Sequence, residues 1–331
     1  MASGISSNPS RYVGLDVGGT SMKAGVVDHA GRPLSNVSLP TEPEKGQAHG
    51  LRTMCAAIRE AVTAAKLTPA DVAAIGVATP GTMDLKTGYI LDPPNLKPWR
   101  NVPVRDHIRS EFKLPTVFQN DANAAAFGEY WAGAGRGVRS LVFFTLGTGV
   151  GGGIVLDDKV LEGEHSHGAE LGHMKIEMTN PRLCGCGKRG CLEAYASASS
   201  VARRAEEALK SDGGASKLHA GPRTDGELTA RDVFQAADEG DELAGRIVDE
   251  TAFYLALGAA NLMHVIDPEM IVFGGGMIAA GEPFLERIRR HVPKVAFPVP
   301  AEHTRLCFAQ LGNDAAINGA AACARFMLKA R

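Results

Sequence analysis

A strand, a short glycine turn and a second strand occur twice in this chain, and this arrangement constrains the fold more than any other feature. Residues 12–28 run Y-V-G-L-D, V-G-G-T-S and M-K-A-G-V-V-D, which predicts a hairpin. Residues 141–156 have the same design, with the strand L-V-F-F-T-L, a glycine turn at 147–153 and a partner strand at 154–156. With 331 residues the chain is long for a single core. We therefore expect two related α/β domains that face each other across a cleft.

Hydrophobic periodicity predicts the other elements. Helices are expected at residues 51–67, 104–111, 122–132, 193–209, 230–239, 243–263, 284–291 and 315–328. Further strands are expected at 72–78, 115–119, 270–273 and 306–309, and loops at 92–99 and 211–226. The last helix is expected to cover the first domain. The predicted small domain is 11–119 with 313–331, the predicted large domain is 120–312, and residues 1–10 are predicted to be a disordered tail.

The composition narrows the class of protein. The formal net charge is -2 and 22% of the residues are charged, so no strongly basic surface is implied. Nucleic acid and anionic membranes are therefore not expected as partners. No apolar run reaches the length of a membrane span, and residues 1–10 lack a secretion signal. We expect a cytoplasmic, reducing compartment, where clustered cysteines bind metal more often than they form disulfides.

One segment carries a candidate metal site. His173 is followed by three cysteines within eight positions, Cys184, Cys186 and Cys191, in the run C-G-C-G-K-R-G-C. A Cys₃His set suits a closed tetrahedral Zn²⁺ site of the structural kind, and the glycines let the backbone curl around an ion. The alternative is a loop that is rich in cysteine by chance. The flanking Glu170 and Glu193 are not needed for four-coordination, so they are free to bind a polyhydroxylated substrate.

The two glycine turns are candidate phosphate sites. Such turns can aim backbone N–H groups at a phosphate because no side chain blocks its approach. The first turn contains Gly18, Gly19 and Thr20, and the second contains Gly147, Thr148, Gly149, Gly151 and Gly152. Neither fits the Walker or the Rossmann pattern. The alternative is that both are ordinary hairpin turns.

Three further positions could carry chemistry. Asp16 ends the first strand beside its turn, where a carboxylate makes sense if Mg²⁺ lies between it and a phosphate; the alternative is a turn cap. The pair Asn120-Asp121 follows a strand, so Asp121 could be a general base for a sugar hydroxyl or merely the N-cap of the next helix. Glycines 274–276 follow another strand and could let an adenine or ribose lie against the backbone.

Together these segments resemble the ROK family (repressors, open reading frames and kinases) of the actin-like ATPase superfamily. The resemblance spans nearly the whole chain and rests on D-V-G-G-T, N-D-A-N-A-A-A-F-G-E, L-G-T-G-V-G-G-G, the E-x-x-H and C-x-C-G-x-x-G-C-x-E segment, and V-F-G-G-G. It implies a two-domain actin-like (ribonuclease H-like) fold with Asp121 as catalytic base. It implies sugar contacts from Gly81, Asn95, Asn120, Asp121, Glu170, His173 and Glu193. It implies contacts to ATP and Mg²⁺ from Asp16, Gly18, Gly19, Thr20, Thr145, Gly147, Thr148, Gly149, Gly274, Gly275 and Gly276.

The resemblance also gives the zinc a role. One ring nitrogen of His173 would bind the metal and the other would face a sugar hydroxyl. The structural zinc would fix the loop that carries Glu170 and Glu193 rather than activate the nucleophile.

Within the family we expect a kinase. The first strand begins near Tyr12, which leaves no room for the helix-turn-helix of the family's repressors. The run P-P-N-L-K-P-W-R-N-V-P resembles bacterial glucokinases, although Lys97-Pro98 stand where many of them have glycine. The expected reaction is ATP-dependent phosphorylation of glucose at its 6-hydroxyl, by a homodimer. Kinases of N-acetylmannosamine, N-acetylglucosamine, fructose or allose, a non-catalytic sugar sensor, and polyphosphate as donor remain alternatives.

Overall fold

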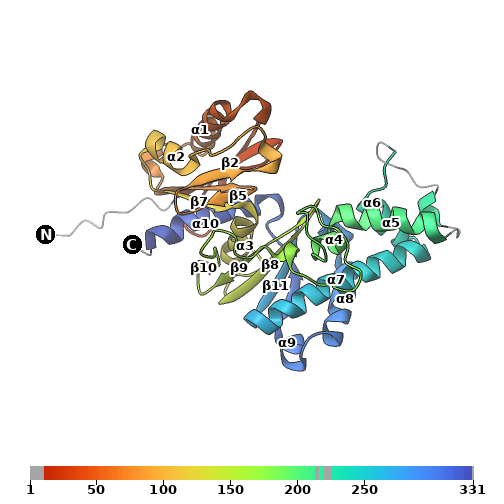
Figure 1. Cartoon of the computed structure of the whole chain (residues 1–331). Coiled ribbons are helices and arrows are strands. Elements are labelled where there is room, and N and C mark those ends of the chain that lie inside the picture. The colour runs from red at the N-terminus through yellow and green to blue at the C-terminus, as the bar shows by residue number, and fades with distance from the viewer. Residues whose placement is uncertain (1–10, 213–215, 220–225, 330–331) are drawn as a thin grey trace. The chain divides into compact units, whose positions relative to one another are not determined.

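The computed structural model describes residues 11–212, 216–219 and 226–329, and in this part the chain is a mixed α/β protein with two five-stranded sheets (Figure 1). It divides into two compact units. Unit 1 contains the residues up to 139, residues 153–169 and those from 310 onward, and unit 2 contains 140–152 and 170–309. The domain limits given above remain predictions. By its contacts, the helix that begins at Asp121 belongs to unit 1.

The sheet of unit 1 brings three strand ends to one edge. Its order is β3-β2-β1-β4-β7, with β1 Tyr12–Val17, β2 Ser21–Val27, β3 Pro33–Pro40, β4 Ala74–Thr79 and β7 Thr116–Asn120. The predicted hairpin of β1 and β2 is confirmed, and β1, β4 and β7 run parallel. Asp16 pairs with Ala78, and Thr79 pairs with Asn120. The carboxyl ends of these strands therefore carry the candidate residues.

One face of this sheet is covered by the last helix, α10 (Ala315–Lys329), which also packs on α3 (Asp121–Ala132). The approach is close because the sheet lacks side chains there. A Cβ on Gly14 would lie 1.9 Å from the carbonyl oxygen of Ile317, and one on Gly76 would lie 1.8 Å from that of Ala320. The prediction that the last helix returns to this sheet is confirmed.

The other face carries the main apolar core of unit 1. This face of the sheet packs against α1 (Gln47–Ala64) and α2 (Val104–Phe112). Ile58 and Ile75 are fully buried here, together with Trp99, whose Nε1 donates to the carbonyl of Pro43. Since the two faces are closed by helices, function is left to the strand ends and the loops.

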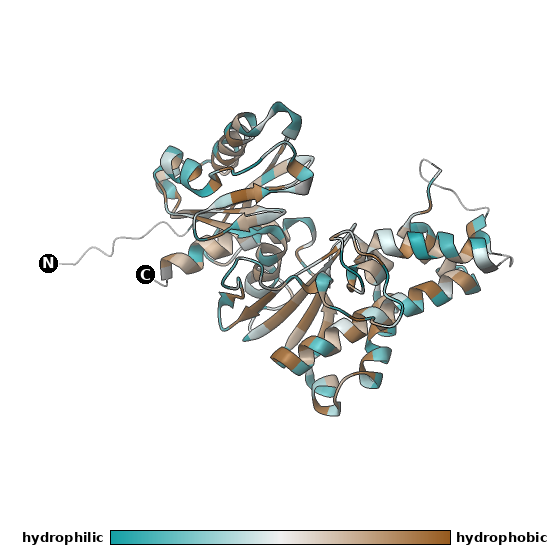
Figure 2. Ribbon diagram, in the orientation of Figure 1, coloured by the Kyte–Doolittle hydropathy of each residue, from teal (hydrophilic) through white to brown (hydrophobic). Residues whose placement is uncertain are grey.

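The second sheet has the order β10-β9-β8-β11-β12. Its strands are β8 Ser140–Leu146, β9 Val150–Leu156, β10 Lys159–Val160, β11 Met270–Gly274 and β12 Arg305–Phe308, and β8, β11 and β12 run parallel. The helices of unit 2 are α4 Glu193–Ala196, α5 Ala198–Asp212, α6 Ala230–Asp238, α7 Glu242–Ile266, α8 Glu282–His291 and α9 Pro298–His303. In Figure 2 the strands of this sheet are mostly brown, as expected for a buried sheet, while the helices carry teal segments. None of the helices in the described ranges is long and apolar enough to cross a membrane.

Several predicted elements need correction. The helix predicted at 193–209 is two helices, because Ser197 interrupts it and its hydroxyl accepts from the backbone N–H of Ser200. The glycine turn predicted at 147–153 ends at 149, and residues 151–153 belong to β9. A Cβ on Gly152 would lie 2.4 Å from the Leu171 side chain, so this glycine serves packing rather than a turn.

Other elements were not predicted. They are β3, the two-stranded sheet of β5 (Thr82–Asp84) and β6 (Tyr89–Asp92), β10 and α9. The loop predicted at 92–99 contains a 3₁₀ turn, Pro94–Leu96. The loop predicted at 211–226 lies largely outside the described residues, but within it Lys217–His219 form a 3₁₀ turn in which Leu218 is buried. The predicted tail at 1–10 also lies outside them.

Candidate functional site

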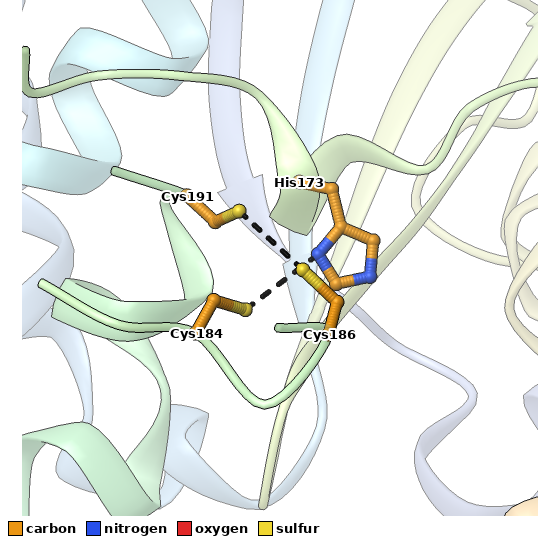
Figure 3. A group of neighbouring side chains, drawn as sticks. All are labelled: His173, Cys184, Cys186 and Cys191. Carbon is orange, nitrogen blue, oxygen red and sulfur yellow. Dashed lines mark hydrogen bonds between the residues drawn. The ribbon is translucent and has the colours of Figure 1, made fainter. Parts of the chain in front are cut away.

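The predicted metal ligands converge in unit 2. The ligand atoms of His173, Cys184, Cys186 and Cys191 all lie within 4.8 Å of one another (Figure 3). The Sγ atoms of Cys186 and Cys191 are 3.8 Å apart, and the Sγ of Cys184 is 3.8 Å from Nδ1 of His173. Zn–S bonds of about 2.3 Å at a tetrahedral angle separate two sulfurs by about 3.8 Å. Two of the separations therefore match tetrahedral coordination, and all four ligand atoms are close enough together to surround one ion.

The backbone around the cysteines is shaped for this purpose. A tight turn joins Cys184 to Gly187, whose N–H donates to the Cys184 carbonyl, and Gly187 has φ +79°. Gly190 also has φ +79°, and a Cβ there would lie 2.2 Å from the carbonyl oxygen of Glu177. Both positions need glycine because they combine positive φ with a close backbone approach or a tight turn.

Charge and burial act unequally on the cluster: burial and the Glu193 carboxylate raise the pKa of the Cys184 thiol to about 12, while the pKa of Cys186 is lowered, mainly by a backbone hydrogen bond. Lys175 Nζ donates to Cys191 Sγ at 2.8 Å, and this hydrogen bond raises the pKa of Lys175. Three thiolates and a dication would leave one net negative charge, and the ammonium group of Lys175 would then balance it. Such a partner outside the ligand set is what tunes and orients a metal site.

Glu193 joins the cysteine loop to the glycine turn of unit 2. Its Oε1 accepts from the thiol of Cys184 at 3.2 Å, and its Oε2 accepts from the backbone N–H of Val150 at 3.0 Å. A Cβ on Gly149 would lie 2.4 Å from Oε2, so only glycine admits the carboxylate here. Glu170, in contrast, is exposed, and its carbonyl accepts from the N–H of His173.

The predicted nucleotide contacts of unit 2 lie at neighbouring strand ends. Thr145 on β8 pairs with Gly274 on β11. Gly275 has φ +85°, and a Cβ there would lie 2.5 Å from the carbonyl oxygen of Leu146. No atom comes within 4 Å of a Cβ placed on Gly147 or Gly276. The second glycine turn and the 274–276 segment therefore form one surface of bare backbone, the kind that accepts a phosphate or a flat base.

In unit 1, two predicted carboxylates influence each other. Burial and, next in size, the charge of Asp121 together raise the pKa of Asp16 to about 6, against the opposing charge of Lys23. Lys23 pairs with Asp16 across the β1–β2 hairpin. Like charges that share a site repel, and a bound cation would remove the repulsion.

The cap of α3 tests the N-cap alternative for Asp121. The side chain of Asn120 accepts from the N–H groups of Ala122 and Asn123 at 2.9 and 3.1 Å, so Asn120 is the N-cap. Asp121 is the first residue of the helix, and its Oδ1 accepts from the N–H of Ala122. The N-cap reading of Asp121 is therefore wrong by one residue.

The first glycine turn lies against a residue that was predicted to bind sugar. The N–H of Gly18 donates to the carbonyl of Ser21, and Thr41 Oγ1 donates to the carbonyl of Gly18 at 2.7 Å. A Cβ on Gly19 would lie 3.0 Å from the backbone oxygen of Asn95. Gly81, after β4, has φ +87°. Asn95 and the turn thus belong to one surface of unit 1.

The family profile described as "ROK family" matches residues 12–326. The chain belongs to the ROK family. The glucokinase of Halalkalibacterium halodurans is 39% identical over 308 residues, which are 93% of this chain and 93% of that protein. The crystal structure of the ROK hexokinase from Thermus thermophilus has a TM-score of 0.84 at 34% identity and covers 97% of this chain and 100% of that one. The ROK glucokinase from Streptomyces griseus, in complex with glucose and AMPPNP, has a TM-score of 0.76 at 35% identity and covers 96% and 99%. The predicted family and the actin-like α/β fold class are confirmed.

Sequence reasoning missed the residues that support the ROK motifs from outside. Strand alternation does not settle the direction of the Lys23 side chain, and the sequence around Thr41 gives no signal. Gln119 directly precedes Asn120 and is 1% exposed. A polar residue at the end of the strand T-V-F-Q, directly before a candidate catalytic pair, is the signal that the sequence offers.

Proposed function

We propose that this protein is an ATP- and Mg²⁺-dependent hexokinase in which Asp121 is the general base. The observation that carries this proposal is the electrostatic coupling of Asp16 and Asp121 where β1 and β7 end in unit 1, beside the glycine turn that follows β1. One carboxylate suits the metal of a nucleotide, and the other suits the proton of an acceptor hydroxyl. The family membership and the kinases among its relatives support the reaction class.

The reaction then follows from these groups. Asp121 takes the proton of the sugar hydroxyl while the sugar oxygen forms a bond to the γ-phosphorus. The bond from that phosphorus to the β–γ bridging oxygen breaks, and ADP leaves with the electron pair. Mg²⁺, when bound, neutralises charge on the phosphates, and Asp16 would hold it through water. Positioning and charge neutralisation supply most of the rate in such transfers.

The contacts are proposed by unit. In unit 1 we assign the sugar to Gly81, Asn95, Asn120 and Asp121, and the nucleotide and metal to Asp16, Gly18, Gly19 and Thr20. In unit 2 we assign the sugar to Glu170, His173 and Glu193, and the nucleotide to Thr145, Gly147, Thr148, Gly149, Gly274, Gly275 and Gly276. Glu193 is already hydrogen-bonded to the backbone N–H of Val150, so a sugar hydroxyl would join an existing contact.

We propose that the Cys₃His cluster holds structural Zn²⁺. The 3.8 Å separations fit tetrahedral coordination, and no fourth position is left open for a substrate. Nδ1 of His173 faces the cysteines, which leaves Nε2 for a sugar hydroxyl. The metal would hold in place the segment between Glu170 and Glu193. Cysteine thiolates of such a site persist in a reducing compartment, so we place the protein in the cytoplasm. A homodimer is our working assembly.

We propose glucose as the acceptor, because the relatives reported above include glucokinases. The test is an ADP-release assay with ATP and Mg²⁺ against glucose, mannose, fructose, allose, N-acetylglucosamine and N-acetylmannosamine. A kcat/KM for glucose well above the rest is expected. Preference for an N-acetylated sugar would keep the mechanism and replace the substrate. No turnover with any sugar, from folded protein that contains zinc, would overturn the kinase and favour a sugar sensor.

A further inference from the structure

Gln119 is a buried polar side chain that the proposed chemistry does not use. It lies in β7, one residue before Asn120, and is 1% exposed. Its Oε1 accepts from the backbone N–H of Asn120 at 2.8 Å and from Nδ2 of Asn123 at 3.4 Å. Its Nε2 donates to Oε1 of Glu162 at 2.8 Å. One amide therefore holds the backbone that leads into Asp121.

The direction of this amide is fixed by its partners. A backbone N–H can only donate, so the oxygen of Gln119 must face Asn120. The NH₂ group then has to meet an acceptor, and the carboxylate of Glu162 provides one. Because a carboxylate accepts and never donates when ionised, the pair works only as amide donor and carboxylate acceptor.

Glu162 is exposed, but its backbone is held on both sides. Its N–H donates to the carbonyl of Val160 at 3.0 Å, and its carbonyl accepts from the N–H of Gly168 at 2.8 Å. A Cβ on Gly168 would lie 2.4 Å from the backbone oxygen of Leu161, so this closure needs glycine. The carboxylate therefore projects from a closed loop and is a firm anchor for the amide.

Packing alone does not hold the amide. Gln119 and Glu162 line a pocket of about 430 Å³ in unit 1, together with Phe127, Cys323 and Phe326. A side chain next to such a space can turn away once a hydrogen bond is lost. The hydrogen bonds, rather than steric fit, therefore determine where the amide lies.

We propose that Gln119 is a positioning residue for Asp121 and that Glu162 locks it. This inference rests on the proposed function. The N–H of Asn120 is fixed by Gln119, the side chain of Asn120 caps α3, and Asp121 is the first residue of that helix. A shift at Asn120 therefore moves the carboxylate of Asp121, and misplacement by about 1 Å can cost roughly 10²-fold in rate.

The decisive test exchanges the two groups. Gln119→Glu places two carboxylates against each other, and neither can donate a hydrogen bond to the other. In the double variant Gln119→Glu/Glu162→Gln, the amide of residue 162 donates to the carboxylate of residue 119, so this hydrogen bond returns in the opposite direction. The carboxylate of residue 119 can still accept from Asn120 and Asn123. We expect kcat of the single variant to fall about tenfold or more, with little change in the KM for sugar, and the double variant to regain most of the loss.

A matched control lies two residues further along the same loop. Glu164 is exposed and pairs with Lys86. Gln119→Glu/Glu164→Gln removes the same charge from the loop but cannot donate to residue 119, so it should stay as slow as Gln119→Glu. Equal recovery in this control would mean that net charge, and not the hydrogen bond, explains the rescue, and the inference would be overturned.

Two measurements keep the outcomes distinct. Hydrogen exchange of the amides of residues 120–123 should accelerate in Gln119→Glu and return to the wild-type rate in the exchanged pair, whatever the activity. Should wild type phosphorylate no sugar while exchange follows this pattern, the proposed function fails and the lock stands. Wild-type turnover combined with unchanged kcat and exchange in Gln119→Glu would refute the lock.

Should Gln119→Glu fail to fold, Glu162→Ala replaces it, since an exposed side chain can be truncated without a core cavity. It removes the acceptor for Nε2, so kcat should fall at least threefold, and Glu162→Gln, which keeps an acceptor oxygen, should lose less. Identical kcat in Glu162→Ala and wild type would overturn the role of Glu162.

Discussion

At the end of β1, Asp16 lies within electrostatic reach of Asp121 and Lys23. Burial, followed by the charge of Asp121, raises the pKa of Asp16 from 3.8 to about 6, against the effect of Lys23. Burial and a neighbouring negative charge disfavour the ionised form of this carboxyl group, so its ionisation lowers the stability of the folded protein. Ionised Asp16 therefore costs stability as long as no cation neutralises it.

This gives a pH-dependent prediction for Asp16→Asn in Mg²⁺-free buffer. The folded pKa of Asp16 lies above its unfolded value. Below pH 3.8 the group is protonated in both states and costs no stability. The cost appears between pH 3.8 and about 6, and it is complete above pH 6. At pH 8 the variant should therefore unfold at a higher temperature than wild type, and its free energy of unfolding should be larger by up to about 3 kcal/mol. At pH 4 the two should differ little. A difference of the same size at both pH values would contradict the account.

Asp121→Asn should lower kcat by about 10²–10⁴ while sugar binding stays measurable, because the amide keeps the shape but cannot take a proton. The measurement is a steady-state assay combined with calorimetric titration of the sugar. Asp106→Asn, an exposed carboxylate of the same kind on α2, serves as the control. Near-normal kcat in Asp121→Asn would remove Asp121 as the base.

At the scale of elements, the strands with continuous apolar runs were predicted well. The apolar runs of β4, β8 and β11 are buried throughout or nearly so, and they were found at the expected places within one or two residues. β3 was missed because its residues alternate between exposed and half-buried, with no buried position.

Contacts between distant residues set the limit of such prediction. Gln119 meets Glu162, which is 43 residues further along the chain, and Val150 meets Glu193 across the same separation. Both glutamates are polar loop or helix-start residues whose sequence surroundings give no sign of a partner. The cysteine cluster was predictable because its ligands are close in sequence.

The packing of α10 on the sheet gives a stability prediction. Gly76→Ala would place a Cβ 1.8 Å from the carbonyl oxygen of Ala320, so the helix must move, and we expect a loss of about 1–3 kcal/mol. Thermal or urea unfolding would measure it.

Gly245→Ala is the matched control for that experiment. It lies in the helix α7 with no atom within 4 Å of the new Cβ, and should be neutral or stabilising by up to about 1 kcal/mol. Equal effects of the two substitutions would contradict close packing of α10.

The cysteine loop gives a prediction about metal. Cys184→Ser and Cys191→Ser should each lose bound zinc and weaken sugar binding together, because both ligands hold the segment between Glu170 and Glu193. Metal analysis by mass spectrometry and calorimetric sugar titration measure the two effects. Cys307→Ser, outside the cluster, should retain both. Zinc-free protein with unchanged sugar affinity would separate the metal from the sugar site.

At the scale of the whole molecule, the chain passes between the two units four times, after residues 139, 152, 169 and 309. Unit 1 is therefore assembled from three separate stretches, and unit 2 from two. Neither unit can be obtained by cutting the chain at a single point.

The position of α10 in this path matters during synthesis. The ribosome completes residues 170–309 before it adds the helix that covers the backbone at Gly14 and Gly76. The strands of unit 1 are made first, yet their covering layer is made last. A nascent chain therefore spends most of its translation time with one face of its earliest sheet open.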